Sequence, residues 1–173
     1  MITIIAGTNR PNSSSLKLAE YYQRQLWARG VDADVLSLSE LPDDFVRADM
    51  YRTPSEAFEP FQARVDRTEK FIFVIPEYNG SFPGILKTFM DACHFPGTFF
   101  EKKAALVGHS TGKYGNIRGV DHFTGVCHYL RLHVLPLRIH IPNIRQELDE
   151  HGNIFREDTL RFTNEQIEDF IRF

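Results

Sequence analysis

The chain has 173 residues, of which 42% are hydrophobic, 13% aromatic and 25% charged, enough for one globular domain spanning residues 1–173. A net charge of −3 gives neither the basic footprint of a nucleic-acid-binding protein nor an acidic tail. The longest apolar runs have the length of strands, so we expect no membrane-spanning helix.

The cysteines and the N-terminus indicate a cellular compartment. Cys93 and Cys127 lie far apart and form no CxxC motif, a pattern typical of free thiols in a reducing environment. The first apolar run begins at Ile2 without a basic segment before it, so we expect no signal peptide. Both observations predict a cytoplasmic protein.

The first third of the chain reads as strand, helix and strand. Strands are expected at 2–6 and at 31–38, where apolar and polar residues alternate. The helix between them presents one apolar face and ends at Gly30; that face carries Leu18, Ala19, Tyr22 and Leu26. Residues 40–54 read as a loop with a short helical turn, and 55–67 as a helix.

The third strand is expected at 71–75, an apolar run without alternation that suits a parallel strand covered on both faces. Pro76 ends it, and Pro83 precedes a helix whose apolar face carries Ile85, Leu86, Phe89 and Cys93. Asn79-Gly80 is a hairpin signal, but a helical pattern follows it and not an alternating strand.

The last third predicts strands at 104–108 and 134–141, the second interrupted by Pro136. A helix between them has an apolar face made of Val120, Phe123, Cys127 and Leu130. Near the C-terminus, Thr163 and Gln166 predict a capping box at the start of the last helix, with a hydrophobic staple between Phe162 and Ile167.

This alternation of strands and helices predicts an α/β fold: a doubly wound, five-stranded parallel sheet of order 2-1-3-4-5 with helices on both faces. The loops after strands one, three and four then leave the same edge of the sheet. Seven of the 11 glycines lie in or beside these loops: Gly7, Gly80, Gly84, Gly108, Gly112, Gly115 and Gly119. Open α/β sheets bind ligands at this edge.

The first loop has the composition of a phosphate site. Its donors are hydroxyl groups and one guanidinium, without any acidic residue: Thr8, Arg10, Ser13, Ser14 and Ser15. The serines stand where the following helix has unpaired N–H groups and a positive dipole end, which favours an anion. The alternative interpretation is an ordinary serine-capped helix with a solvated arginine.

The absence of two motifs narrows the choice of phosphate-containing ligand. The sequence contains neither GxGxxG, which disfavours a dinucleotide bound in the Rossmann manner, nor GxxxxGK[ST], which disfavours a nucleoside triphosphate. Tyr78 and Tyr114 offer stacking surfaces, while Asn79 and Ser110 can read the polar edge of a ring. FMN has both a phosphate for the first loop and a planar ring for the second and third loops.

Two motifs resemble the NADPH-dependent FMN reductase family. Gly7-Thr8-x-Arg10-x-x-Ser13 is similar to the family's phosphate loop. The more specific motif is Pro76-Glu77-Tyr78-Asn79-Gly80-Ser81-x-Pro83-x-x-Leu86-Lys87, with Asp91 further on. The resemblance covers almost the whole chain. It implies a flavodoxin-like fold, a dimer or tetramer, and the reduction of flavins, quinones, azo dyes or metal oxyanions.

The resemblance also implies a cofactor-binding role for each matching residue. Thr8, Arg10, Ser13 and Ser15 would contact the FMN phosphate beside Ser14. The ribityl chain and ring edge would follow Pro76, Glu77, Tyr78, Asn79 and Gly80, and the far side of the ring would meet Ser110, Thr111, Gly112 and Tyr114. One departure stands in the third loop, where Asn116 follows Gly115 in place of a second glycine. This departure bears on the second-substrate pocket more than on the flavin site.

We therefore expect an FMN-dependent oxidoreductase that takes hydride from NADPH or NADH and passes it to a flavin, quinone or similar small acceptor. The cofactor carries this chemistry, so no catalytic side chain is predicted. The alternative is an electron carrier resembling flavodoxin, although a net charge of −3 provides little field for steering a protein partner. The seven histidines include no HExxH and no i,i+4 pair, so we predict no metal site.

The segment 85–100 predicts assembly, because it carries more apolar surface than one helix and loop need. Its large side chains are Phe89, Met90, Phe95, Phe99 and Phe100. Burial against a second copy explains the surplus and predicts a homodimer or homotetramer. The alternative is that the segment folds back over the edge of its own sheet.

Overall fold

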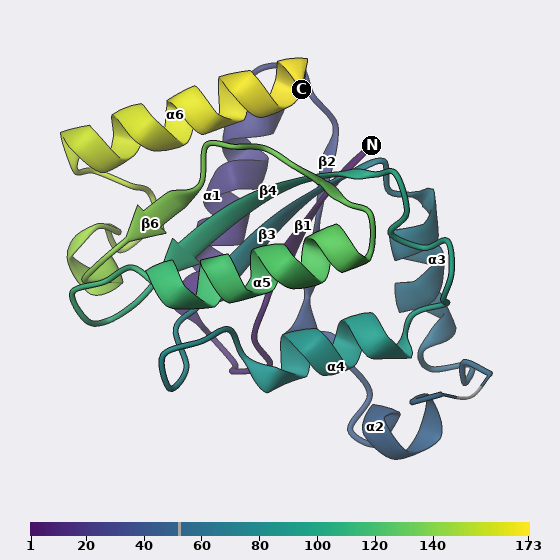
Figure 1. The fold of residues 1–173 in the computed structure, drawn as a ribbon. Helices are drawn as coiled ribbons and strands as arrows, with labels where there is room; N and C mark the ends of the chain where they lie inside the picture. Colours follow the sequence, from purple (N-terminus) through teal and green to yellow (C-terminus); the bar gives the residue numbers. More distant parts are fainter. Residues whose placement is uncertain (52) are drawn as a thin grey trace.

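The structure, a computed structural model, describes residues 1–51 and 53–173. A six-stranded parallel sheet forms its centre, with strand order β2-β1-β3-β4-β5 and with β6 pairing β4 beyond β5 (Figure 1). The strands are β1 Ile2–Ala6, β2 Ala33–Ser37, β3 Lys70–Pro76, β4 Lys103–His109, β5 His133–Val134 and β6 Ile139–Ile141. The predicted sheet type and strand order are confirmed.

The fifth predicted strand is two short strands. β5 and β6 both pair with β4, but the four residues 135–138 between them leave the ladder after Leu135 donates to the carbonyl oxygen of Ala104 at 2.8 Å. Pro136 has no N–H to donate and a fixed φ, so the strand cannot continue through it. The interruption that we predicted at Pro136 therefore divides the strand completely into β5 and β6.

The α-helices are α1 Ser14–Trp27, α2 Phe45–Ala48, α3 Glu59–Arg67, α4 Gly84–Ala92, α5 Ile117–Tyr129 and α6 Glu157–Arg172, with 3-10 turns η1 Leu38–Glu40 and η2 Ile144–Gln146. α3 begins four residues later than predicted, with Pro60 in its first turn. One residue of the predicted loop at 40–54, residue 52, lies outside the described residues. Before it, the short helix α2 is the helical turn that the sequence predicted.

Helices cover both faces of the sheet, as predicted, and β3 shows the division most clearly. Phe71, Phe73 and Ile75 pack among side chains of α3, α4 and α5. Ile72 and Val74 point the opposite way and pack with α1 and α6. In Figure 1, α5 lies in front of the sheet and α1 behind it. This alternation follows from the two-residue period of a strand and gives the molecule one core on each face.

The predicted capping box is wrong. α6 begins at Glu157, so Thr163 and Gln166 lie inside the helix. The Thr163 hydroxyl donates to the carbonyl oxygen of Thr159 at 2.9 Å. The buried Gln166 amide donates to the carbonyl oxygens of Leu106 (3.1 Å) and Leu137 (2.9 Å). A threonine that bonds its own preceding turn satisfies the same sequence pattern as a cap, which explains the error.

The prediction that the apolar surplus of 85–100 faces a second copy is wrong for most of its side chains. Phe89, Met90 and Phe99 are buried within the chain, and the Phe99 ring centroid lies 5.5 Å from that of Phe71. The segment thus folds back over its own core. Phe95 remains 65% exposed and stacks edge-on against the half-buried Phe100.

Within residues 1–51 and 53–173, no helix combines the length and the apolar character that crossing a membrane requires.

Candidate functional site

Three loops meet at the carboxyl edge of β1, β3 and β4 and enclose a polar cavity of about 390 Å³. The parallel register aligns Ala6 with Val74 and Pro76 with His109, so the loops start at nearly the same level. Ten of the fourteen predicted site residues line this cavity: Thr8, Arg10, Ser13, Ser14, Ser15, Pro76, Glu77, Tyr78, Ser110 and Thr111. The other four, Asn79, Gly80, Gly112 and Tyr114, lie outside its wall.

The first loop turns sharply from β1 into α1. Gly7 donates to the carbonyl oxygen of Val74 at 2.9 Å, and a Cβ at position 7 would lie 2.9 Å from that same oxygen. Ser13 is the N-cap of α1, and its Oγ accepts from the N–H of Leu16 at 3.1 Å. The serine cap that the alternative interpretation of this loop expected is therefore present. Ser14 and Ser15 occupy the first turn, where backbone N–H groups have no partner within the helix.

Tyr78 joins the first loop to the second. Its hydroxyl lies 2.6 Å from Thr8 Oγ1, and the Arg10 guanidinium lies over its ring, 5.2 Å from the centroid. One face of the ring is therefore engaged by Arg10, so Tyr78 belongs to the arginine end of the cavity. The sequence had predicted that Tyr78 offers its ring to the planar part of the ligand, but in the structure Arg10 lies over that ring.

The Asn79-Gly80 pair forms a tight turn. Tyr78 and Ser81 exchange two backbone hydrogen bonds, of 2.9 and 3.0 Å, across two residues with φ of 51° and 76°. This geometry matches the two-residue reverse turn that the pair favours. Only one bridge forms, and α4 follows, so the prediction of a helix after this pair is confirmed.

The third loop is held by a closed set of hydrogen bonds. Ser110 Oγ donates to the carbonyl oxygen of Gly112 and accepts from the N–H of Gly115, both at 2.9 Å. The Glu77 carboxylate accepts from the N–H of Asn116 at 3.2 Å. Glu77 therefore acts in the structure as a backbone-capping carboxylate, which links the second loop to the third.

Asn116 adopts the backbone conformation that a second glycine would otherwise provide in the third loop. It adopts the left-handed conformation, with φ of 63°, immediately before α5. Asparagine tolerates this region better than other residues that carry a Cβ. Its buried side-chain amide also donates to the carbonyl oxygen of Ile75 at 3.0 Å, so the substitution ties the third loop to β3.

Five further residues line the cavity. Pro11 and Asn12 belong to the predicted first loop, whereas the sequence-based prediction missed His109, Ile144 and Arg145. Backbone hydrogen bonds from Asn143 to Gly112 and from Ile144 to Ser110, both 2.9 Å, bring the segment after β6 to the third loop. No local pattern signals this long-range contact. For His109 a signal existed, because alternation along β4 places it on the same face as Ala105 and Val107.

The charges at the cavity favour an anion. Arg10 and Arg145 line it with a single acidic residue, Glu77, whose carboxylate already accepts from the Asn116 N–H. Hydroxyl groups and the first turn of α1 add donors. Among the described residues, no group of three or more His, Cys, Asp or Glu side chains is arranged to hold a metal ion.

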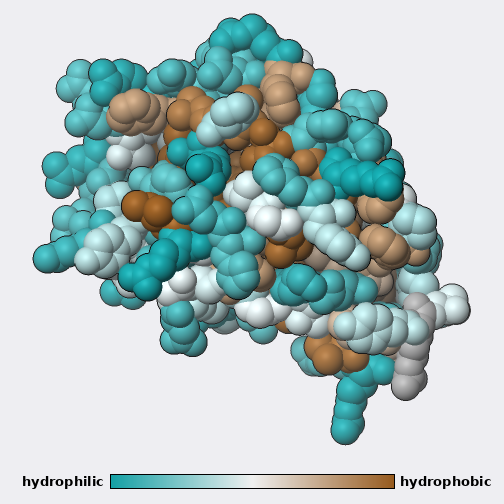
Figure 2. Space-filling view, viewed as in Figure 1, coloured by the Kyte–Doolittle hydropathy of each residue, from teal (hydrophilic) through white to brown (hydrophobic). Residues whose placement is uncertain are grey.

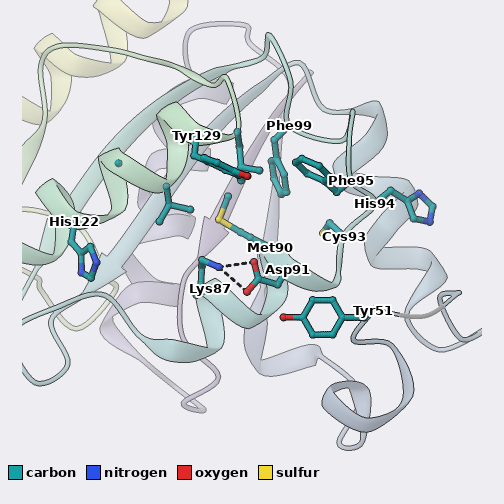
Figure 3. Close-up of a pocket in the computed structure, with 13 residues that line it drawn as sticks. Tyr51, Lys87, Met90, Asp91, Cys93, His94, Phe95, Phe99, His122 and Tyr129 are labelled. Carbon is teal, nitrogen blue, oxygen red and sulfur yellow. Dashed lines mark hydrogen bonds and ion pairs between the residues drawn. The ribbon is translucent and has the colours of Figure 1, made fainter.

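A second hollow, the α4–α5 groove, has about 640 Å³ and a different character. Its lining is mainly apolar: Tyr51, Lys87, Met90, Asp91, Cys93, His94, Phe95, Phe99, His122, Gly125, Val126, Tyr129 and Leu130. Figure 3 shows Phe95, Phe99 and Tyr129 around it, with Lys87 paired to Asp91 at 2.7 Å. Figure 2 shows the same side of the molecule, where apolar patches lie between polar side chains.

The chain belongs to the NADPH-dependent FMN reductase family, whose model matches residues 1–146. It is therefore an oxidoreductase of the class that depends on FMN and NAD(P)H.

Particular relatives support this assignment. A 2-hydroxy-1,4-benzoquinone reductase from Burkholderia sp is 27% identical over 165 residues, covering 93% of this chain and 88% of that protein. An NAD(P)H-dependent FMN reductase from Pseudomonas aeruginosa is 25% identical over 143 residues, covering 80% and 76%. The solved structure of a flavoenzyme NAD(P)H:(acceptor) oxidoreductase from Paracoccus denitrificans matches the fold with a TM-score of 0.83 and 21% identity, covering 99% of this chain and 94% of that one.

Proposed function

We propose that this protein binds FMN with its phosphate in the polar cavity, takes hydride from NADPH or NADH, and reduces a small acceptor of the quinone or flavin type. The observation that carries the proposal is the convergence of three separate loops, with two arginines, on one polar cavity at the carboxyl edge of the sheet. Each arginine can make charge-assisted hydrogen bonds to an anion, which are roughly twice as strong as neutral ones.

The residues present fit the phosphate end of FMN. Arg10 and Arg145 supply charge, the hydroxyl groups of the first loop supply donors, and Ser14 and Ser15 in the first turn of α1 line the same cavity. A charge-assisted hydrogen bond contributes about 1.5–3 kcal/mol. The helix dipole adds about 0.3–1 kcal/mol. The hydrogen bonds therefore account for most of the binding free energy at this end.

The ring of the cofactor would lie beyond the cavity, along the second and third loops. Asn79, Gly80, Gly112 and Tyr114 lie outside the cavity wall, and we propose that they border the ring. Bound FMN supplies the hydride chemistry. The chain supplies binding and orientation, and we assign no side chain as a catalytic acid or base.

The proposal of a small, planar acceptor rests on the names of relatives. Besides the benzoquinone reductase, they include an FMN-dependent NADPH-azoreductase from Staphylococcus aureus, 31% identical over 116 residues. Quinones and azo dyes are flat conjugated molecules that can stack on a flavin. We propose the same class of acceptor for this chain.

We further propose that the chain is one domain that works in the cytoplasm as a homodimer or a dimer of dimers. Both cysteines are buried free thiols, which suits a reducing compartment. For assembly, the α4–α5 groove is apolar, and Phe95 and Tyr129 beside it are 65% and 78% exposed. Contiguous apolar surface of this kind is typical of an interface.

The phosphate assignment is tested by Arg10→Ala. Loss of the guanidinium removes a charge-assisted bond, so FMN affinity falls about ten- to a hundred-fold, whereas riboflavin, which lacks the phosphate, binds both proteins equally. Arg47→Ala, an exposed arginine on α2 outside the cavity lining, is the control. Equal FMN affinity of Arg10→Ala and wild type contradicts the assignment. Bound flavin that NADPH and NADH both fail to bleach indicates an electron carrier.

A further inference from the structure

His109 is placed beneath the phosphate loop by the sheet itself. Residues alternate along β4, and Ala105 and Val107 pack on the face that α1 covers. His109 is the next residue on that face and the last of the strand. Its neighbours on both sides are fixed, because it pairs with Pro76 of β3 and with Ile141 of β6. The imidazole is therefore held against the first turn of α1.

The ring makes one polar contact, with Ser15. His109 Nε2 lies 2.8 Å from Ser15 Oγ, and the two residues are only 4% and 0% exposed. Burial lowers the pKa of His109 to about 4, so the imidazole is neutral at pH 7. A neutral imidazole carries one proton, on either Nδ1 or Nε2.

The surroundings decide which nitrogen carries that proton. Nδ1 is buried, and no hydrogen-bond partner for it lies among the described residues. Nδ1 has no partner in either tautomer, but an unpartnered buried N–H donor is rarer and costlier than an unpartnered buried acceptor, so the proton is better placed on Nε2. A proton on Nε2 is donated to Ser15 Oγ. The serine hydroxyl can either donate or accept, so the contact with Ser15 permits both tautomers, and the unpartnered Nδ1 is what favours Nε2–H.

This tautomer determines what Ser15 can do. An oxygen that accepts from Nε2–H directs its own proton elsewhere, and Ser15 lines the polar cavity beside the first-turn N–H groups of α1. We propose that His109 is a positioning residue whose Nε2–H holds the Ser15 hydroxyl as a donor toward the phosphate of the bound flavin nucleotide. The inference rests on the proposed FMN site and adds a reason for preferring FMN to riboflavin.

The tautomer is measured first, in the protein without added flavin. Nitrogen-15 NMR of histidine-labelled protein distinguishes a protonated from a bare ring nitrogen, and His109→Gln assigns the signal. We expect the proton on Nε2 and a bare Nδ1. A proton on Nδ1, or a protonated imidazolium at pH 7, overturns the inference without any reference to FMN binding.

The role toward phosphate is measured by the ratio of FMN affinity to riboflavin affinity. His109→Leu removes the donor, so this ratio should fall at least tenfold. His109→Gln keeps an N–H in a similar place and should stay within threefold of wild type. In a Ser15→Ala background, His109→Leu should change the ratio no further, because the hydroxyl it positions is gone. Using a ratio cancels distortions that weaken both ligands equally.

The outcomes separate the two proposals. If wild type binds FMN no better than riboflavin, or Arg10→Ala leaves the ratio unchanged, the phosphate site itself is wrong. If Arg10→Ala lowers the ratio and His109→Leu leaves it at the wild-type value, only the role of His109 is overturned. Should His109→Leu fail to fold, Ser15→Ala decides: the ratio should fall, because the donor to the phosphate is gone, and a ratio equal to that of wild type overturns the proposal.

Discussion

The polar cavity and the α4–α5 groove differ in how they are built. The cavity is the smaller, about 390 Å³ against about 640 Å³, and loops at the carboxyl edge of three parallel strands enclose it. Hydrogen bonds between the loops fix it, such as those of Tyr78 to Thr8 and of Glu77 to the Asn116 N–H. The groove is formed mainly by the sides of α4 and α5 with the aromatic segment after α4.

The difference shows that size alone does not identify a cofactor site. A phosphate needs several fixed donors and a positive local charge, and only the smaller hollow offers both. The larger hollow offers apolar area, which binds another apolar surface without needing directional contacts. Three changes test this division of roles.

The largest effect is expected at the groove. Phe95→Asp buries a carboxylate at the centre of the proposed interface in each copy, so the dimer dissociation constant should rise by roughly a hundredfold or more. Light scattering at micromolar concentration measures the mass. Phe155→Asp, the same substitution at an exposed phenylalanine outside the groove, should leave the dimer intact. A wild-type mass of one chain contradicts the dimer, and a Phe95→Asp dimer removes the groove from the interface.

A smaller effect is expected where the third loop leaves β4. A Cβ at Gly108 would lie 2.6 Å from the carbonyl oxygen of Gly115 and 2.7 Å from Val120 Cγ2. Gly108→Ala should therefore lower the unfolding free energy by about 1–3 kcal/mol, as overpacking does. It should also weaken FMN binding, because the third loop must shift. Gly84→Ala, where a Cβ meets nothing within 4 Å, is the matched control in denaturant titrations. Equal stability of the two variants argues against a rigid third loop.

The last effect is absent at neutral pH and develops only as pH falls below 6.5. The pKa of His109 is about 4 in the folded protein against an ordinary 6.5, so between these values the unfolded chain binds a proton that the folded chain does not. Stability should fall as pH drops from 6.5 toward 4, by up to about 1.4 kcal/mol per pH unit, and stay level above 6.5. His109→Gln removes this contribution. Urea titrations of both proteins between pH 5 and 7.5, taken as differences, isolate it from the other titrating groups. Parallel pH profiles would mean that His109 is more accessible than its burial indicates.

The sequence by itself determined the fold, its strand order and the chemistry of the first loop. Strand runs, helical faces and the serine cap at Ser13 are local patterns, because backbone geometry repeats every two or 3.6 residues. The parallel connections then forced the loops after β1, β3 and β4 to one edge. Ten of the fourteen predicted site residues consequently line a single cavity.

Only the tertiary structure decided which distant residues complete the cavity and which apolar side chains are buried within the chain. Arg145 reaches the cavity through backbone bonds that join the segment after β6 to the third loop, a contact that no spacing encodes. Thr163 satisfied a cap pattern but lies within α6, and Phe99 filled the core next to Phe71. Each of these outcomes depends on partners distant in the sequence. Local propensity contributes too little free energy to decide between a buried and an exposed position, so packing and long-range hydrogen bonds decide it.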